Sequence, residues 1–164
     1  MAVTLDILES YRAPRRVMAR QLATGAGEER ALAYVMIACF LFFIALLPSL
    51  SRTAYLNPEG GDFANLASNA FIGSVLIAPL LFYGIAALSR IAAMVFGGKG
   101  SWLSARLALF WALLAVSPLM LFRGLVMGLI GQGPALSLVN LVVGLLFLLI
   151  WIGALRAGES ASGA

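Results

Sequence analysis

Long blocks of hydrophobic residues alternate with short polar segments along almost the whole chain. At about 1.5 Å of rise per residue, roughly twenty helical residues cross the hydrocarbon core of a lipid bilayer. The pattern predicts transmembrane helices over residues 31–50, 71–96, 102–122 and 135–155. Pro79 and Pro118 fall inside two of these runs, and each predicts a bend in its helix. We therefore expect an all-α, polytopic transmembrane bundle of four helices.

Some stretches beside these runs leave alternatives open. Residues 63–70 are half apolar and are expected to form an interfacial lead-in to the second span. Residues 124–130 either extend the third helix or lie in the membrane interface, and "GQGP" at 131–134 divides them from the fourth span. A five-span arrangement, in which residues 119–133 form a short helix pair, also fits the pattern. Residues 156–164 are expected to form a flexible C-terminal tail.

The N-terminal segment, residues 1–30, is polar and basic. In "PRRVMARQLA", Val17 and Met18 can face one way while Arg16 and Arg20 face another. This spacing is typical of an amphipathic helix on a membrane surface. A solvated cytoplasmic tail has the same charges, and both interpretations remain open.

The arginines and lysine predict the orientation of the bundle. If the N-terminus is inside and there are four spans, nine of the eleven basic residues lie in inner segments. Only Arg52 and Arg123 lie outside. Loops on the cytoplasmic side carry the excess of Lys and Arg, so the N-terminus is expected to be cytoplasmic. Topology thus accounts for these charges, and nucleic-acid binding is not indicated.

The composition agrees with a membrane protein and argues against common catalytic chemistries. Hydrophobic residues make up 62% of the chain and charged residues 11%, whereas soluble domains carry about 25% charged residues. The only cysteine is Cys39 and there is no histidine, so no intrachain disulfide or Ser-His pair is available. All seven acidic residues lie in tails or loops. Proton-coupled transporters and intramembrane aspartyl proteases need carboxylates within the membrane. We therefore expect no enzyme activity, no metal and no cofactor.

The stretch "FGGKGS" between the second and third spans invites comparison with a phosphate-binding loop. Such a loop needs a glycine five positions before the Gly-Lys pair, a Ser or Thr after the lysine, and a preceding strand. Here Lys99 is followed by Gly100, and no glycine lies five positions before Gly98. We predict instead a helix stop at Gly97, a basic inner loop, and Ser101 as the cap of the next helix.

This stretch and the helix after it, "FGGKGSWLSARLALFWALLAVSPLMLF", resemble the signature region of bacterial Yip-domain proteins, the Ypt/Rab-interacting membrane protein family. The matching residues are Gly97, Gly98, Lys99, Gly100, Ser101, Ala108, Leu109 and Pro118. The segment "PRRVMARQL" and the final helix, with Trp151 before a short Gly-Glu-Ser tail, are also similar to the family. The resemblance implies an integral protein of the bacterial inner membrane, and many members have five spans. Eukaryotic members act with small GTPases in vesicle traffic, whereas for bacterial members it implies a membrane domain of unsettled function.

Three basic residues are candidates for contact with an anionic lipid headgroup. Arg90 precedes the inner end of the second span, Lys99 lies in the next loop, and Arg106 follows in the third span. Basic groups on the cytoplasmic side attract anionic lipids. Alternatively, Arg90 snorkels to the inner headgroups without forming a site.

Small and polar residues are candidates for helix packing. Gly124 and Gly128 form a G-x-x-x-G pair, and Ala108 and Ala112 belong to a small-residue stripe. Small residues let helices approach closely in lipid, and Asn140 can hydrogen-bond between helices. The contacts so formed lie either within the chain or between two chains.

These observations predict a non-catalytic membrane interaction or organising protein, such as an adaptor or accessory subunit. Its expected partners are the bilayer with its anionic lipids, and other membrane proteins or a second copy of itself. The alternative is a channel or transport component for a small solute or a lipid. That alternative requires polar side chains of the spans to converge on one face.

Overall fold

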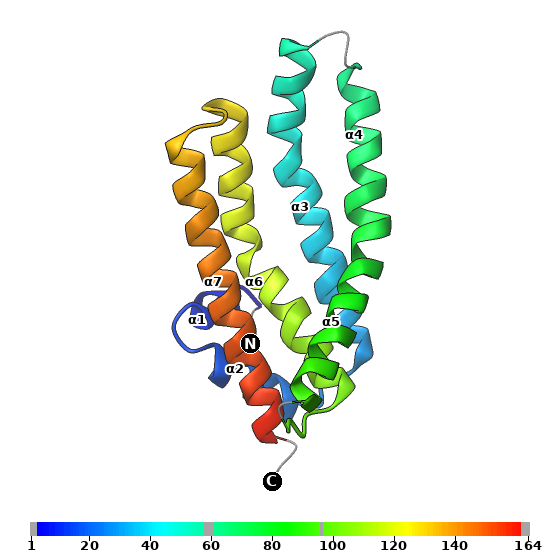
Figure 1. Ribbon diagram of the computed structural model, residues 1–164, viewed down its shortest axis with the longest axis vertical. Coiled ribbons are helices and arrows are strands. Elements are labelled where there is room, and N and C mark those ends of the chain that lie inside the picture. The colour runs from blue at the N-terminus through cyan, green and yellow to red at the C-terminus, as the bar shows by residue number, and fades with distance from the viewer. Residues whose placement is uncertain (1–2, 58–60, 96, 162–164) are drawn as a thin grey trace.

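The computed structural model describes residues 3–57, 61–95 and 97–161, and over these ranges the chain is a helical bundle without strands (Figure 1). In chain order the elements are α1 (Val3–Ser10), α2 (Pro14–Ala23), α3 (Glu28–Leu56), α4 (Phe63–Phe71), η2 (Ile72–Ile77), α5 (Ala78–Val95), α6 (Trp102–Leu129) and α7 (Pro134–Ala161). α3, the α4–η2–α5 unit, α6 and α7 are each long and apolar enough to cross a membrane. The predicted all-α transmembrane bundle is confirmed, and the chain is an integral membrane protein.

Helix α6 is the centre of the bundle. It packs against α3 and α7 along much of its length and against α5 near its first residues. In α6, 61% of the most apolar stretch is buried, whereas the other three candidate spans bury 17% to 28% of theirs. Among the described residues, Trp111 and Phe110 of α6 are the two largest fully buried side chains. The core of the protein therefore follows one helix, and most residues in the apolar stretches of its neighbours are only partly buried or are exposed.

The helices are longer than the predicted spans. The first begins at Glu28 and ends at Leu56, so it extends past both ends of the predicted 31–50. α6 continues to Leu129, so residues 124–129 extend the third helix and do not form a separate interfacial segment. α7 continues to Ala161, so residues 156–161 are helical where a flexible tail was predicted. Within the described ranges the candidate spans are four, as in the four-span arrangement.

The prolines within the second and third candidate spans are accommodated locally. Directly before Pro79 the helix widens to the π-helical segment η2, where the amide of Ala78 bonds the carbonyl of Gly73. A widened turn of this kind accepts the missing N–H of a proline without ending the helix. In α6, Pro118 cannot bond the carbonyl of Leu114. The Ser117 hydroxyl donates to that carbonyl at 2.7 Å instead.

Helices α1 and α2 form a short hairpin that packs against the flank of α6 and α7 (Figure 1). Val17 and Met18 are fully buried while Arg16 is exposed, as their spacing predicts. The indole N–H of Trp111 donates to the Ser10 hydroxyl at 2.9 Å, within the core. The N-terminal segment is therefore part of the folded bundle.

Candidate functional site

The glycine loop between α5 and α6 is built around a carboxylate from the far end of the chain. Glu159 on α7 accepts a hydrogen bond from the Gly100 amide at 2.6 Å and pairs with Arg90 at 3.1 Å. A β-carbon added at Gly98 or Gly100 would lie 2.5 Å from a Glu159 carboxylate oxygen. The loop is thus glycine-rich because the Glu159 side chain rests on it. Its anion is an internal carboxylate, in the place where a phosphate loop would hold a ligand.

The loop also begins the next helix as predicted. Gly97 has a φ of 78°, which favours glycine and turns the chain away from α5. Ser101 is the N-cap of α6 and exchanges hydrogen bonds with Ser104 in a capping box. The prediction of a helix cap at Ser101 is confirmed.

The three candidate lipid-contact residues lie at the same end of the bundle, in different surroundings. Arg90 is 7% exposed, and besides Glu159 it contacts the carbonyl of Gly98. Arg106 pairs with Glu28 at 2.6 Å, and both side chains are partly exposed. Lys99 is exposed and has no charged or hydrogen-bonding partner among the described residues. Acids of this chain therefore already engage two of the three cations, and contact with lipid stays a prediction.

Sequence reasoning missed Glu159 as the partner of Arg90. The two residues are 69 positions apart, and Glu159 lies in the segment that was predicted to be a flexible tail. One signal was available, because Glu159 is the only acid in the C-terminal third of the chain. An arginine close to a span is costly without an anion, so a single acid at the same membrane side was a candidate partner.

The G-x-x-x-G pair packs two helices of the same chain. A β-carbon at Gly124 would overlap the carbonyl oxygen of Ala45, and one at Gly128 would overlap the Pro48 ring. Both contacts lie between α6 and α3, so these glycines serve packing within the chain.

The remaining packing candidates separate into two groups. Ala108 and Ala112 are fully buried on α6. Asn140 lies on α7 and accepts a hydrogen bond from Arg123 of α6 at 2.5 Å, in an exposed position. The structure therefore places all four small residues at α6 contacts and Asn140 at an inter-helix hydrogen bond.

Polar side chains within the spans bond to their own helices. The hydroxyls of Ser74, Ser89 and Ser117 donate to backbone carbonyls three or four positions earlier, at 2.5 to 2.8 Å. Tyr83 packs edge-on against Phe110. The three serine hydroxyls are therefore already engaged by carbonyls of their own helices.

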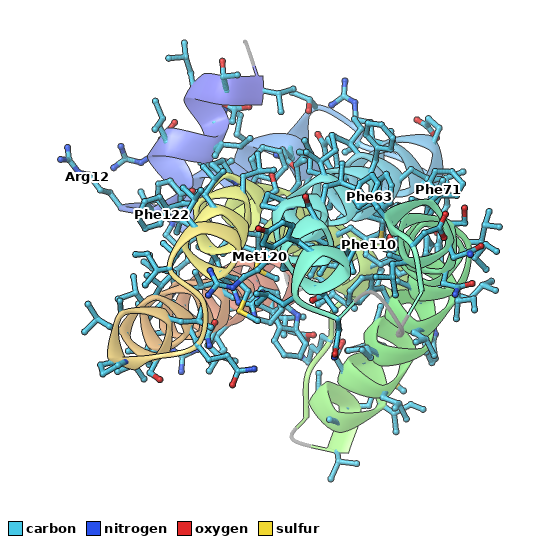
Figure 2. The ribbon with its side chains drawn as sticks, turned by 90° about the horizontal axis from the view of Figure 1, so that it is seen from above. Arg12, Phe63, Phe71, Phe110, Met120 and Phe122 are labelled. Atoms are coloured by element: carbon cyan, nitrogen blue, oxygen red, sulfur yellow. The ribbon has the colours of Figure 1, made fainter. Side chains whose placement is uncertain are left out.

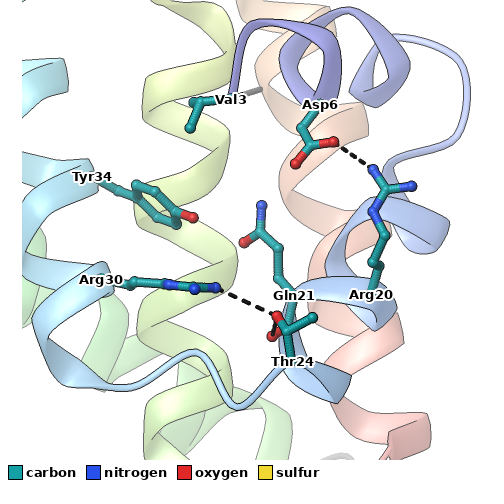
Figure 3. Close-up of a pocket in the computed structure, with 7 residues that line it drawn as sticks. All are labelled: Val3, Asp6, Arg20, Gln21, Thr24, Arg30 and Tyr34. Carbon is teal, nitrogen blue, oxygen red and sulfur yellow. Dashed lines mark hydrogen bonds and ion pairs between the residues drawn. The ribbon is translucent and has the colours of Figure 1, made fainter. Parts of the chain in front are cut away.

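A polar pocket lies between the α1–α2 hairpin and the start of α3 (Figure 3). Its volume is about 370 Å³. Asp6 and Arg20 form an ion pair at 2.5 Å on one side, and Arg30 reaches Thr24 on the other. The hydrogen bond that Arg20 donates to Glu9, together with the charges of Asp6 and Glu9, raises the pKa of Arg20 above its usual value.

The amide of Gln21 lies at the centre of this pocket, and both its nitrogen and its oxygen lack hydrogen-bond partners. Gln21 is 5% exposed. A buried amide without a partner is costly, so this side chain is available to a polar group that enters the pocket.

A second hollow runs between the α1–α2 turn and α7, with a volume of about 720 Å³. We call it the arginine groove, because four arginines line it: Arg12, Arg15, Arg16 and Arg156. All four are exposed, and Arg12 projects from the edge of the molecule (Figure 2). Its opposite wall is apolar and belongs to α7.

A third hollow opens on the membrane-embedded surface and is lined only by apolar atoms, with a volume of about 520 Å³. We call it the apolar groove; Phe82, Leu113, Gly144 and Trp151 are among its lining residues. The indole N–H of Trp151 is buried and has no partner. An added β-carbon at Gly144 meets no atom within 4 Å, so the groove is open there.

Comparison of this chain with family models, with curated proteins and with solved structures gave no match. The resemblance to the Yip-domain family therefore stays a prediction.

Proposed function

We propose that this chain is a non-catalytic protein of a bacterial inner membrane that acts as an adaptor or accessory subunit for other membrane proteins. The observation that carries the proposal is how the bundle uses its acidic groups. Asp6 and Glu9 pair with Arg20, Glu28 with Arg106, and Glu159 with Arg90.

A reaction centre needs an acid, a base or a nucleophile that faces a cavity and is free to react. The paired carboxylates instead hold elements of the fold together. Among the described residues no group of three or more metal-ligating side chains comes together. An adaptor also needs surface that its own chain does not cover, and three of the four candidate spans bury only 17% to 28% of their most apolar stretch.

A transport role receives less support. The hydroxyls in the spans bond to backbone carbonyls of their own helices, and the groove on the membrane side is lined by apolar atoms. Neither arrangement provides a hydrated path for a small solute.

The test is purification of the tagged full-length chain from its own membranes in mild detergent, after crosslinking and with mass spectrometry. We expect one membrane protein, or a second copy of the chain, at a constant ratio. Recovery of the chain alone, with only lipid attached, would overturn the adaptor role and turn attention to flux assays in proteoliposomes.

Two glycines offer a matched pair of positions for locating the surface that contacts the partner protein. Gly144 on α7 and Gly84 on α5 both have open space around an added β-carbon. Gly144 lines the apolar groove and Gly84 does not. We expect Gly144→Leu and Gly84→Leu to fold alike, so loss of the partner in only one of them assigns the contact to that face.

The proposed orientation has the N-terminus in the cytoplasm. In a chain with Cys39→Ala, single cysteines at exposed Thr24 and at Tyr55 lie near opposite ends of α3. We expect an impermeant thiol reagent to label Tyr55→Cys in intact cells and Thr24→Cys only after permeabilisation. The reverse result would invert the proposed topology.

A further inference from the structure

The basic residues of the chain divide sharply into paired and unpaired cations. Arg20, Arg90 and Arg106 have carboxylate partners. Arg30, Arg52 and Arg123 bond to uncharged oxygens. Among the described residues, the cations without any such partner are Arg12, Arg15, Arg16, Lys99 and Arg156.

Four of these five unpaired cations line one hollow, the arginine groove. The two acids nearest to it are engaged elsewhere, since Glu9 bonds Arg20 at 2.9 Å and Glu159 bonds Arg90 at 3.1 Å. The positive-inside rule requires these charges to be cytoplasmic, but it does not require them to gather at one hollow without counter-charges. The four arginines of the groove therefore have no carboxylate partner among the described residues.

The other wall of the groove is a hydrophobic strip of a membrane-spanning helix. Leu146, Leu149 and Ile152 of α7 line it, and Leu149 is 64% exposed. From Leu146 to Arg156 the strip extends about 15 Å along the helix axis. It thus leads from the arginines into the hydrocarbon region of the bilayer.

The α1–α2 turn is fixed beside this strip. The Tyr11 hydroxyl donates to the carbonyl of Ala115 at 2.7 Å. A β-carbon at Gly153 would lie 2.7 Å from the Pro14 ring, so the absence of a side chain lets α2 approach α7 closely. Burial raises the pKa of Tyr11, which keeps its hydroxyl a donor. These contacts fix the position of the arginine-bearing wall of the groove relative to its apolar wall.

We propose that the arginine groove binds one anionic phospholipid. The phosphate of the headgroup lies among Arg12, Arg15, Arg16 and Arg156, and one acyl chain lies along Leu146, Leu149 and Ile152. Arginine suits this role because its planar guanidinium gives paired hydrogen bonds to a phosphate. An acidic segment of another protein would match the arginines but not the leucines, which face hydrocarbon. The proposal goes beyond the adaptor role and does not depend on any protein partner.

The experiment uses the purified full-length chain in mild detergent. Retained lipid is measured by native mass spectrometry, and apparent affinity by the shift in melting temperature on adding lipid. The probes are phosphatidylglycerol, zwitterionic phosphatidylcholine, and glycerol phosphate, which has the headgroup charge without acyl chains. We expect phosphatidylglycerol to stabilise the chain and the other two probes to have no effect.

Arginine variants test whether the lipid headgroup lies among the arginines of the groove. One basic residue near an anionic headgroup contributes about a fivefold change in affinity, so Arg12→Gln/Arg156→Gln should weaken phosphatidylglycerol binding roughly 25-fold. Arg52→Gln/Arg123→Gln is the matched control, because it also removes two positive charges, and neither residue lines the groove or belongs to the three predicted lipid contacts. Circular dichroism of each variant verifies that it folds. Equal binding by the double variant and the control would overturn the proposal.

A second pair of variants tests whether an acyl chain lies along the apolar wall of the groove. Leu149→Ala shortens the strip, whereas Leu141→Ala truncates a similarly exposed leucine of α7 outside the groove. We expect a two- to threefold loss of affinity only for Leu149→Ala. If glycerol phosphate competes fully, or if both leucine variants bind like wild type, the groove takes free anions or an acidic protein segment, and the lipid proposal is wrong.

Discussion

Helices α6 and α7 are each 28 residues long, and both qualify as membrane spans, yet they occupy opposite positions in the bundle. α6 buries 61% of its most apolar stretch inside the protein and α7 buries 17% of its own. Of the four candidate spans α6 is the least hydrophobic and α7 the most. The comparison shows that hydropathy predicts whether a helix enters the membrane but not whether it lies at the centre.

The physical reason for this difference between α6 and α7 is that the surrounding solvent is lipid. Lipid is as apolar as leucine, so a leucine-rich surface gains little by turning inward, and packing decides which helix is central. The alanines and glycines of α6 let α3 and α7 approach its backbone, and its fully buried Trp111 finds a hydrogen-bond partner in Ser10. α7 holds its place through a few specific contacts, including Glu159 and Gly153.

The largest expected contrast comes from glycines. Gly124→Leu on α6 forces a side chain into the carbonyl of Ala45, whereas Gly144→Leu on α7 meets open space. We expect the first to lower the free energy of unfolding by at least about 3 kcal/mol, and the second to change it by less than about 0.5 kcal/mol. Unfolding by dodecyl sulfate in mixed micelles, followed by circular dichroism, measures both. Similar losses would mean that α6 and α7 are equally packed.

A smaller effect is expected where α7 depends on charge. Glu159→Ala leaves Arg90, whose side chain is 9% exposed, without its carboxylate, and should cost about 2 kcal/mol because the charge is largely buried. Glu28→Ala is the control: it removes a carboxylate that is 50% exposed from Arg106, and should cost less than about 1 kcal/mol. The same micelle titration compares them. If Glu28→Ala proves the more destabilising, the end of the bundle that contains Arg90 and Arg106 is held by α3 rather than by α7.

The smallest expected effect distinguishes the two tryptophans whose indole N–H groups are buried. Trp111→Phe on α6 removes a hydrogen bond of 2.9 Å to Ser10, at an expected cost of about 1 kcal/mol. Trp151→Phe on α7 removes an N–H that has no partner, so we expect no loss of stability from hydrogen bonding. Thermal melts followed by circular dichroism are suitable, because both changes alter the fluorescence. A larger loss for Trp151→Phe would contradict the assignment of partners.

The sequence predicted the parts of this fold that depend on neighbouring residues. The membrane spans follow from hydrophobic runs, and the cap at Ser101 follows from the polar residue before a helix. The small-residue pair of Gly124 and Gly128 was recognised as a packing motif, but its contacts with Ala45 and Pro48 on α3 were not, because the one-dimensional pattern does not say which helix approaches.

The candidate sites were harder to predict, for the same reason. The pairing of Arg90 with Glu159 and the docking of the α1–α2 hairpin join residues that are far apart in the chain. Charge alone predicted that Arg90, Lys99 and Arg106 share one side of the membrane. It could not predict that acids of the chain engage two of them while Arg12, Arg15, Arg16 and Arg156 remain unpaired.

The contact between Glu159 and the glycine loop has a consequence for biosynthesis. Arg90 and Gly100 leave the ribosome long before Glu159, which follows Arg90 by 69 residues. The loop therefore cannot take its final form while the chain is being made, and Arg90 enters the membrane region without its partner. The α1–α2 hairpin also cannot reach its final position before the last helix is made, because Pro14 packs on Gly153 of that helix. Insertion of α7 therefore supplies both contacts at once, and a chain that lacks α7 would leave the glycine loop without Glu159 and the α1–α2 hairpin without Gly153.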